Sequence, residues 1–572
     1  MKSVLVAFAA LAMFAGCSKK EAPAAPVAPD ENTVRMTAQG EVIGFVTPDG
    51  AHSWRGLPFA APPVGDLRWR APQQPAGWEG ARIATEFGAR CAQMSNRLNA
   101  QEKIEPGLLL GSEDCLYLDI YAPANSRLAD APGEKLPVMV WIHGGSNVWG
   151  RGSSYDGSRL AVHENVIIVP VQYRLGPFGF FSDPMLRADA QTPEDAAANF
   201  AILDLIASLR WVQENIGAFG GDPDNVTIFG ESAGGHNVGA LLASPLAKGL
   251  FQRAILQSGS FDSVPVTDAE NANSKERNPS GAIVQKLGAQ SAEALRGVSA
   301  TRLLEAYGMG VEDRIEMPTV IADGVTVPAA GLRESLSSAE TFNPVPIITG
   351  VNRDELKFFH AASQRLTKKF LGIFLVSRDK GFYDAVAEYP SRIWRIRSVD
   401  QPAAAIAAAG GAPVYAYRFD WDEGGRFGFS DLAHLLGAAH AIEIPFVFNR
   451  FQLLGDLDNV MFRKKTAASR EKLSRAMGAY WANFARDGAP SAEGFPNWPA
   501  YSSAGGTLLR FDSNTDGGIE IMQNTDTLEK LTADLKADPR LNAEERCLVV
   551  EAIRFWLDGL AEEISADIGC AA

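Results

Sequence analysis

Short runs of apolar residues recur along the chain, separated by segments in which apolar positions have helical spacing. Continuous apolar runs of this length that end at glycine or polar residues predict buried β-strands. Residues 201–221 have helical spacing and stop at a Gly pair, which predicts a helix. Strands that alternate with helices predict an α/β fold with a largely parallel sheet. The predicted strands lie within residues 136–145, 165–174, 225–232, 250–260 and 345–355.

Two long stretches have fewer strand signals and more helical spacing. They are residues 260–340 and 357–430, and we interpret them as insertions over the sheet and not as separate domains. The length of 572 residues is compatible with one large α/β domain. No internal repeat is found.

The composition is that of a globular protein, with 46% hydrophobic and 21% charged residues. The formal net charge is -15. A diffuse acidic charge argues against a nucleic-acid-binding surface, so nucleic acid is not an expected partner.

The N-terminus has the pattern of a targeting segment. Lys2 precedes an apolar stretch, Val4–Phe14, that is too short to span a bilayer. An Ala-Gly pair and Cys17 follow, and small residues before a cysteine resemble a bacterial lipoprotein signal. We expect residues 1–16 to be a signal peptide of lipoprotein type, with a plain signal peptide as the alternative.

Residues 17–33 are rich in Ala and Pro and predict an extended linker, which a lipid on Cys17 would anchor. This places the protein in the cell envelope, on the periplasmic or extracellular face of a membrane. The expected membrane contact is through this anchor only. Residues 34–572 form the predicted folded domain.

The five cysteines fit the same export route. With Cys17 assigned to lipid, an even number remains. The neighbours in sequence, Cys91 with Cys115 and Cys547 with Cys570, would each close a loop of modest size as a disulfide. The alternative is four unrelated buried thiols.

Ser232 is the candidate nucleophile. Residues 230–234, Gly-Glu-Ser-Ala-Gly, fit the pattern G-x-S-x-G, with a predicted strand before it and a predicted helix after it. Such a sharp turn presents the serine hydroxyl above the sheet edge. Because the turn is crowded, it favours the glycines two residues before and two residues after the serine. The alternative is a serine that only caps the helix.

Several longer motifs resemble those of the type-B carboxylesterase and cholinesterase family. Residues 219–235, FGGDPDNVTIFGESAGG, are similar to its serine signature, and residues 113–123, EDCLYLDIYAP, to its second signature. Residues 54–72, WRGLPFAAPPVGDLRWRAP, are similar to a further family motif. The resemblance covers almost the whole chain after the linker. It implies a single α/β-hydrolase domain with a large, mostly parallel central sheet.

The resemblance also implies an acid that would act with Ser232. Residues 350–355, Gly-Val-Asn-Arg-Asp-Glu, resemble the family segment that ends in the triad acid, which indicates Glu355. Arg353 stands where the family has Lys. Asp354 is the alternative acid.

The base follows from a second resemblance. Residues 437–448, GAAHAIEIPFVF, resemble the family segment that contains the triad histidine, which indicates His440. The resulting order Ser, acid, His is that of α/β-hydrolases. His434 is interpreted as a packed or surface histidine. His236 lies close to Ser232 in sequence, but a base must be held by a carboxylate and reach the leaving group, so we expect only a local packing or hydrogen-bonding role for it.

Ester hydrolysis places negative charge on the carbonyl oxygen, and preorganised N–H groups stabilise that charge. By resemblance these donors are the main-chain N–H groups of Gly145, Ser146 and Ala233, although the family usually has glycine at position 146. Glu231 matches a family residue that could favour the imidazolium or be a buried structural acid. Ser258 matches a serine near the triad acid, with an ordinary strand-end turn as the alternative.

Other side chains are candidates for the substrate pocket. Trp149, Phe358 and Phe359 could line it, with core packing as the alternative for each. Asn147 stands where the family commonly has an aromatic or apolar residue, so we expect a more polar pocket wall.

These observations predict an exported serine carboxylesterase that hydrolyses small-molecule esters through an acyl-enzyme on Ser232. This chemistry requires no metal and no organic cofactor. One alternative is a hydrolase of amides, carbamates or lactones with the same triad. The other is a non-catalytic cholinesterase-like binding protein, which would not need an intact Ser, Glu and His set.

Overall fold

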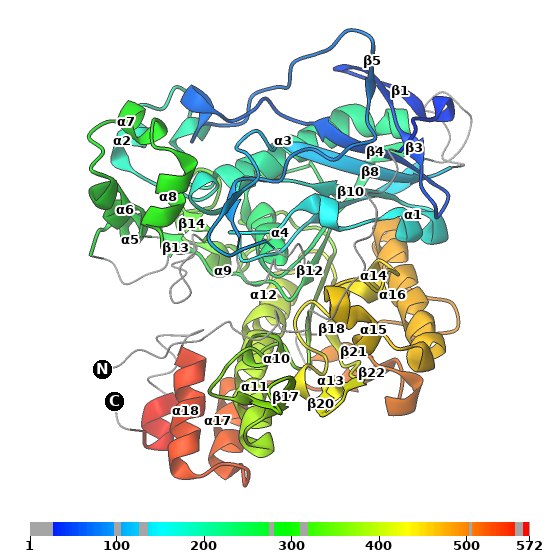
Figure 1. Cartoon of the computed structure of the whole chain (residues 1–572), viewed down its shortest axis with the longest axis vertical. Coiled ribbons are helices and arrows are strands. Elements are labelled where there is room, and N and C mark those ends of the chain that lie inside the picture. Colours follow the sequence, from blue (N-terminus) through cyan, green and yellow to red (C-terminus); the bar gives the residue numbers. More distant parts are fainter. Residues whose placement is uncertain are drawn as a thin grey trace.

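A computed structural model describes residues 27–95, 104–124, 135–273, 279–308, 319–502, 506–554 and 564–570, and an 11-stranded sheet organises this part of the chain (Figure 1). From β21 to β10 neighbouring strands are parallel. The strands at both edges pair antiparallel. The predicted α/β fold with a mostly parallel sheet is therefore confirmed. In spatial order the strands are β22 (Glu520–Gln523), β21 (Thr507–Phe511), β18 (Val414–Phe419), β15 (Ile347–Asn352), β12 (Arg253–Gln257), β11 (Gly221–Glu231), β9 (Leu136–Ile142), β10 (Ile167–Val171), β8 (Tyr117–Pro123), β4 (Ala51–Pro58) and β3 (Phe45–Val46).

The sheet has a hydrophobic core on each face. Along β9, Val138 and Val140 belong to one core, and the alternating residues Met139 and Trp141 belong to the other. This division follows because successive side chains of a strand point to opposite faces. The first core is covered by α3 (Phe200–Asn215) and α4 (Ala233–Ala243), and the second by α16 (Ala467–Asp487).

The two stretches interpreted as insertions are largely helical, with one difference. β18 lies inside residues 357–430 and is a central strand of the sheet, so this stretch is not an insertion throughout. The first stretch contains α5 (Val266–Glu270), α6 (Ser280–Leu287), α7 (Ala292–Arg296), α8 (Ala300–Ala306), α9 (Leu332–Ser335) and the short strands β13 (Val264–Pro265) and β14 (Ile321–Ala322). The second contains α10 (Lys357–His360), α11 (Lys380–Arg395), α12 (Gln401–Ala408) and the strands β16 (Thr367–Phe370), β17 (Phe374–Ser377) and β19 (Arg426–Phe427).

The C-terminal helices α17 (Leu528–Ala537) and α18 (Ala543–Arg554) pack with α11 in a separate hydrophobic cluster, at the bottom of Figure 1. The N-terminal strands lie at the opposite end of the molecule in this view. The remaining strands and α-helices are β1 (Val34–Thr37), β2 (Gly40–Ile43), β5 (Ala81–Ile83), β6 (Gln93–Met94), β7 (Leu109–Leu110), β20 (Ser430–Asp431), α1 (Ser158–Glu164), α2 (Pro184–Ala188), α13 (Leu432–Leu435), α14 (Ile444–Val447) and α15 (Asp458–Met461).

The predicted signal peptide and Cys17 lie outside the described residues, and the first described residue, 27, falls within the predicted linker. Within the described ranges, no helix combines the length and the apolar character that a membrane span needs. The same ranges contain no cluster of His, Cys, Asp or Glu side chains arranged to hold a metal ion.

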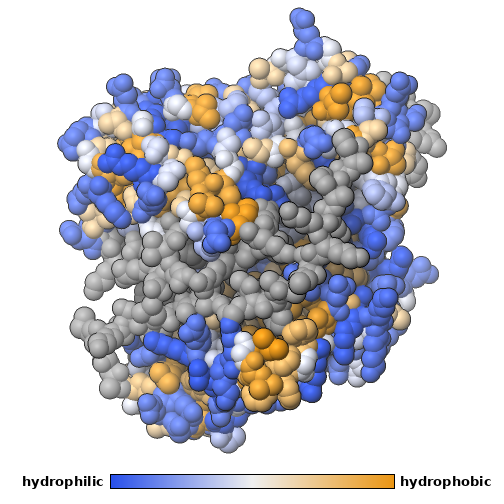
Figure 2. Space-filling model, viewed as in Figure 1, coloured by the Kyte–Doolittle hydropathy of each residue, from blue (hydrophilic) through white to orange (hydrophobic). Residues whose placement is uncertain are grey.

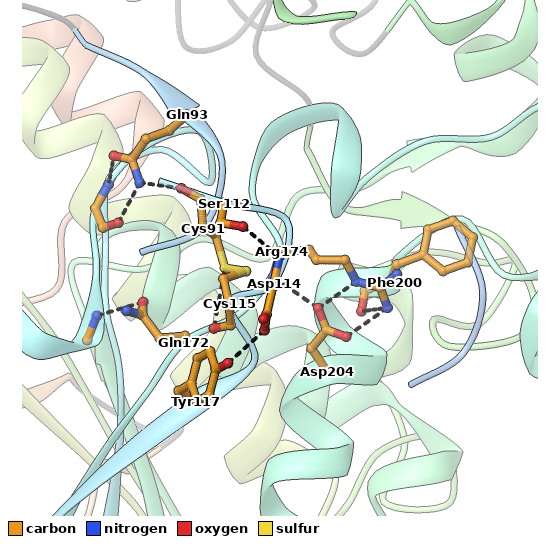
Figure 3. The surroundings of a disulfide bond; sticks show 12 residues. Cys91, Gln93, Ser112, Asp114, Cys115, Tyr117, Gln172, Arg174, Phe200 and Asp204 are labelled. Atoms are coloured by element: carbon orange, nitrogen blue, oxygen red, sulfur yellow. Dashed lines mark hydrogen bonds and ion pairs between the residues drawn. A yellow bond between two sulfur atoms is a disulfide. The ribbon is translucent and has the colours of Figure 1, made fainter. Parts of the chain in front are cut away.

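Both predicted disulfides are present in the structure. The Cα atoms of Cys91 and Cys115 are 4.9 Å apart, and those of Cys547 and Cys570 are 5.5 Å apart. Near the first disulfide, the Gln93 amide donates to the Gly150 carbonyl oxygen at 2.9 Å and accepts from the Gly150 N–H at 3.0 Å (Figure 3). The first disulfide loop is thereby attached to the segment that follows residues 144–147.

We expect the double variant Cys91→Ser/Cys115→Ser to lose about 3 kcal/mol of unfolding free energy, because the disulfide restricts the unfolded chain. Urea unfolding measures this loss. Cys547→Ser/Cys570→Ser is the matched control, since the sequence separations of 24 and 23 residues predict similar entropy. Only the first variant should also slow ester hydrolysis, because its loop supports Gly150. Equal losses of activity in both variants would contradict this difference.

Candidate active site

Ser232 occupies the turn between β11 and α4. Its φ of 56° and ψ of -122° lie in a region that few L-residues adopt. The Ser232 N–H donates to the Gln257 carbonyl oxygen of β12 at 2.8 Å and holds the turn in place. A Cβ at Gly234 would collide with the Ile142 carbonyl oxygen of β9, which explains the second glycine of the motif. Ser232 is partly exposed between two buried neighbours and lies at the carboxyl end of β11, where sites gather in parallel sheets.

Glu355 is fully buried beyond the end of β15. One carboxylate oxygen, Oε1, accepts from the Asn352 N–H at 2.7 Å and from the Ser258 hydroxyl at 2.5 Å. The other oxygen, Oε2, lies 2.6 Å from Nδ1 of His440. Three donors therefore converge on one carboxylate, which stabilises its negative charge. Ser258 thus contacts the candidate acid directly.

Asp354, the alternative acid, has a different set of partners. Its Oδ2 accepts from Arg353 at 2.7 Å and from the Ala438 N–H at 3.1 Å, and its own N–H donates to the Ala438 carbonyl oxygen at 3.0 Å. Within the described ranges it has no hydrogen bond or ion pair to His440. Asp354 thus ties the acid loop to the segment that carries the histidine.

Aromatic rings surround His440. The centroids of the Phe358 and Phe359 rings lie 6.3 and 5.5 Å from the imidazole centroid, so both phenylalanines are at the site. The Trp394 ring of α11 is closer, at 4.9 Å. Trp394 was not a sequence candidate, because it lies far from every motif in the chain. Trp149, the third candidate, packs against one of the two cores.

The second imidazole nitrogen of His440 faces a carboxylate. Nε2 lies 3.1 Å from Oε1 of Glu231, the residue before the candidate nucleophile. None of the hydrogen bonds between described residues joins Ser232 directly to His440. Burial alone would lower the pKa of the imidazole, but the carboxylates of Glu231 and Glu355 raise this pKa to about 9. Burial raises the pKa of Glu231 well above its usual range, so the two side chains titrate as a pair.

We expect Glu231→Gln to shift the pH dependence of kcat/KM toward lower pH. A general base must be neutral to accept a proton, so activity should rise with pH through the pKa of about 9 of His440. When the proton of this pair lies on the imidazole, Glu231 is a carboxylate opposite Nε2; glutamine cannot carry that charge, so the imidazolium is less stable and its pKa falls. A pH series with a soluble ester measures the midpoint of this limb. An unchanged or higher midpoint in Glu231→Gln would refute the coupling.

Among the candidate oxyanion donors, Ala233 directly follows Ser232, and the loop of Gly145 and Ser146 meets this turn at Gly144, where a Cβ would come within 3.1 Å of Cβ of Ser232. Gly145 has φ of 110°, and a Cβ there would collide with the Trp149 carbonyl oxygen. Ser146 has φ of 55°, a left-handed conformation that costs an L-residue roughly 1–2 kcal/mol, which explains why glycine is usual in the family. The N–H groups of Gly145, Ser146 and Ala233 make no hydrogen bond to another described residue. Ala233 begins α4, so its N–H has no partner within the helix.

The Asn147 side chain, expected from sequence to make the pocket wall more polar, is taken up by a hydrogen-bonded amide pair. It is buried, and its amide exchanges two hydrogen bonds with the Asn237 amide of α4, at 2.9 and 3.3 Å. The Tyr173 hydroxyl donates to the His143 carbonyl oxygen at 2.6 Å in the same loop. These contacts attach the loop of the candidate donors to the helix that follows Ser232. No local pattern reveals such an amide pair.

Glu443 is a further buried carboxylate that sequence reasoning did not assign, although it belongs to the His440 motif. Its oxygens accept from the Gln257 amide at 3.0 Å and from the Asn352 amide at 2.6 Å. Burial raises the pKa of Glu443. The main-chain N–H of Asn352 also donates to Glu355, so Asn352 connects Glu443 to the candidate acid.

The other two histidines of interest lie in separate surroundings. Nε2 of His236 is 2.6 Å from the Asp262 carbonyl oxygen, in keeping with the expected hydrogen-bonding role. His434 lies between Ser377 and Asp384, with nitrogen–oxygen distances of 3.2 and 3.4 Å.

Comparison with known proteins decides the family. Residues 31–395 and 376–531 match the model of the carboxylesterase family. The chain belongs to the carboxylesterase family. The predicted family is confirmed, and with it the activity class, carboxylic ester hydrolysis.

Relatives of this carboxylesterase come from bacteria and animals. It is 37% identical over 506 residues to Para-nitrobenzyl esterase of Bacillus subtilis, across 83% of this chain and 94% of that protein. It is 36% identical over 519 residues to Cocaine esterase of Homo sapiens, across 82% of this chain and 86% of the human protein.

Solved structures confirm the α/β-hydrolase fold of this carboxylesterase. A PNB esterase structure matches with a TM-score of 0.66 and 34% identity, over 87% of this chain and all (100%) of the other. A carboxylesterase of Geobacillus stearothermophilus matches with a TM-score of 0.68 and 32% identity, over 88% of this chain and 99% of the other.

Proposed function

We propose that Ser232, His440 and Glu355 act as nucleophile, base and acid in ester hydrolysis. The observation that carries this proposal is the buried Glu355–His440 pair, with an Oε2 to Nδ1 distance of 2.6 Å. A carboxylate at Nδ1 holds the proton on that nitrogen and leaves Nε2 free to accept one. Ser232 is the partly exposed serine of the adjacent turn.

In the first half-reaction, Ser232 Oγ attacks the ester carbonyl carbon and its proton passes to Nε2 of His440. This step requires Nε2 to turn from Glu231 toward Ser232. The negative oxygen of the tetrahedral intermediate accepts from the N–H groups of Gly145, Ser146 and Ala233. The intermediate collapses to an acyl-serine, and the imidazolium protonates the departing alcohol.

In the second half-reaction, a water molecule attacks the acyl carbon while Nε2 of His440 takes its proton. The same donors stabilise the second oxyanion. Collapse releases the carboxylic acid and returns the proton to Ser232. The residue roles thus require only protein groups and water.

The test is labelling with a fluorophosphonate probe, followed by peptide mapping. We expect one labelled serine, Ser232, and no label in Ser232→Ala. Label on another serine would refute the assigned nucleophile. Matched 4-nitrophenyl esters and 4-nitroanilides with the same acyl group then separate ester from amide hydrolysis.

The aromatic surroundings of His440 support apolar esters as the substrate class. Phe358, Phe359 and Trp394 provide apolar surface beside the imidazole, where a leaving group must be protonated. Two relatives are named Para-nitrobenzyl esterase and Cocaine esterase, and both names refer to compounds with an aromatic ring. We expect a higher kcat/KM for an aryl ester than for an ester of equal size that carries a charge. The opposite order would refute this preference.

The N-terminal pattern supports lipid attachment at Cys17 after removal of residues 1–16. The two disulfides are typical of an exported protein. Mass spectrometry of the N-terminal peptide tests the proposal directly. A lipid-modified Cys17 at the mature N-terminus is the expected result, and an unmodified Cys17 or a different N-terminus would refute it.

A further inference from the structure

Two adjacent hairpins expose a cluster of large apolar side chains. The turn between β16 and β17 exposes 69% of Leu371 and 57% of Ile373, and the turn between β19 and β20 exposes 61% of Phe429. Figure 2 shows this apolar surface at the lower centre, where Figure 1 places β17 and β20. Clustered apolar exposure of this kind marks an interaction site. The members of the cluster, called the apolar knob, are Phe370, Leu371, Ile373, Phe427 and Phe429.

The two hairpins hold the apolar knob outward. The Phe374 ring lies between them, with its centroid 5.9 Å from the Phe427 ring and 5.3 Å from the Phe429 ring. The centroids of Phe370 and Phe429 are 5.0 Å apart. The Leu375 N–H donates to the Ser430 hydroxyl at 2.8 Å and joins the hairpins. The exposed side chains therefore belong to an ordered surface.

Leu371 is unfavourable for the fold in two ways. Its side chain is largely exposed, and its φ of 52° lies in the left-handed region that disfavours an L-residue with a bulky side chain. The described residues give this leucine no compensating core packing. A large apolar side chain at the tip of the turn is suited to a contact with another molecule.

The hairpin of β16 and β17 lies in a positively charged segment of an acidic chain, whereas residues 420–431, which carry the second hairpin, contain four acidic residues and one basic residue. Residues 365–380 contain five basic residues and one acidic residue, Asp379, in a chain of net charge -15. The basic side chains are exposed, and Lys368 and Lys369, which directly precede Phe370, form a cationic border of the apolar knob. Arg426, next to the apolar knob, is paired with Asp431. The basic residues of the segment are Arg365, Lys368, Lys369, Arg378 and Lys380.

We propose that the apolar knob inserts into the interfacial region of an anionic lipid membrane, with the bordering cations against the lipid headgroups. Apolar side chains beside Lys and Arg suit this environment, since the hydrophobic effect and the negative surface potential act together. A second copy of the chain fits less well, because a symmetric contact would bring two cationic borders together. This membrane contact is additional to the lipid expected on Cys17 and independent of the catalytic assignment.

The test measures binding to vesicles by sedimentation, with the full mature chain carrying Cys17→Ser so that no acyl chain contributes. We expect salt-sensitive binding to vesicles of phosphatidylcholine with phosphatidylglycerol, and weaker binding to phosphatidylcholine alone. Adding Leu371→Ser/Ile373→Ser should lower the partition coefficient at least about tenfold. The matched control is Met36→Ser/Ile83→Ser, because these side chains are 64% and 61% exposed on the N-terminal sheet. The control should bind like the parent.

A second variant, Lys368→Glu/Lys369→Glu, tests the cationic border. It should lose binding to the anionic vesicles and leave the weak binding to phosphatidylcholine unchanged. Hydrolysis of a soluble ester should be the same for all variants, which shows that each one is folded. The proposal is overturned if the Cys17→Ser chain does not bind anionic vesicles, or if the apolar-knob variant binds as well as its parent. It is also overturned if the chain is a dimer that Leu371→Ser/Ile373→Ser converts to monomers, since the apolar knob would then be a protein interface.

Discussion

His440→Ala is expected to lower kcat by several powers of ten while leaving the fold intact. Removing the imidazole takes away the group that accepts the Ser232 proton and later protonates the leaving alcohol. In serine hydrolases, loss of one triad member removes most of the catalysis that the triad provides. The residual rate would come from the N–H donors and from substrate binding.

His236→Ala is the matched control for this prediction. His236 is closer to Ser232 in sequence, but its Nε2 contacts the Asp262 carbonyl oxygen at 2.6 Å. We expect its loss to cost about tenfold in kcat, roughly 1.4 kcal/mol in the barrier, through packing beneath the turn. Steady-state kinetics with a soluble ester, after circular dichroism has verified folding, compares the two variants. An inactive His236→Ala beside an active His440→Ala would reverse the assignment.

Glu355→Gln is expected to lower kcat about 10⁴-fold, the loss seen when a triad carboxylate becomes an amide. Glu355 accepts from two donors on Oε1 and faces Nδ1 of His440 through Oε2. Glutamine has only one acceptor oxygen, so its NH₂ group must face either Nδ1 or the N–H of Asn352. If the amide oxygen accepts from the Asn352 N–H, the NH₂ group faces Nδ1 of His440. Nδ1 must then act as an acceptor, and the imidazole proton moves to Nε2. That tautomer cannot take the proton of Ser232.

Asp354→Asn distinguishes the two neighbouring carboxylates. Asp354 has ion pairs with Arg353 and Lys357, so we expect Asp354→Asn to lower the unfolding free energy. Its kcat should remain within about tenfold of the parent, since it orients His440 only through Ala438. Urea unfolding and steady-state kinetics measure both effects. A 10⁴-fold loss in Asp354→Asn, with an active Glu355→Gln, would make Asp354 the acid.

Much of the fold could be predicted because its signals are local. The runs that became β9, β10, β11, β12 and β15 are short and apolar and end in glycine or polar residues, which favours buried strands. β18 was missed because it lies between helical segments and has no motif of its own. Its position between β15 and β21 depends on the packing of the complete sheet.

The candidate site, like the fold, could be predicted only in part. Ser232, Glu355 and His440 were found from their motifs, and the structure brings the acid and the histidine together. The role of each remains a proposal that the variants above test. The orientation of Nε2 toward Glu231 was not predictable, because it depends on where the loop of His440 meets the end of β11.

The sequence by itself determined the strand–turn–helix around Ser232, the pairing of cysteines that are close in the chain, and the family. Each of these features can be read from segments of at most a few tens of residues, because the residues within one segment determine its local backbone geometry and its motif. Only the tertiary structure decided the pairing of Asn147 with Asn237, the support of Glu355 by Asn352 and Glu443, and the outward position of the apolar knob. Each of these depends on contacts or solvent exposure that arise when distant segments pack together, and a buried polar group must then find its partner wherever the fold provides one.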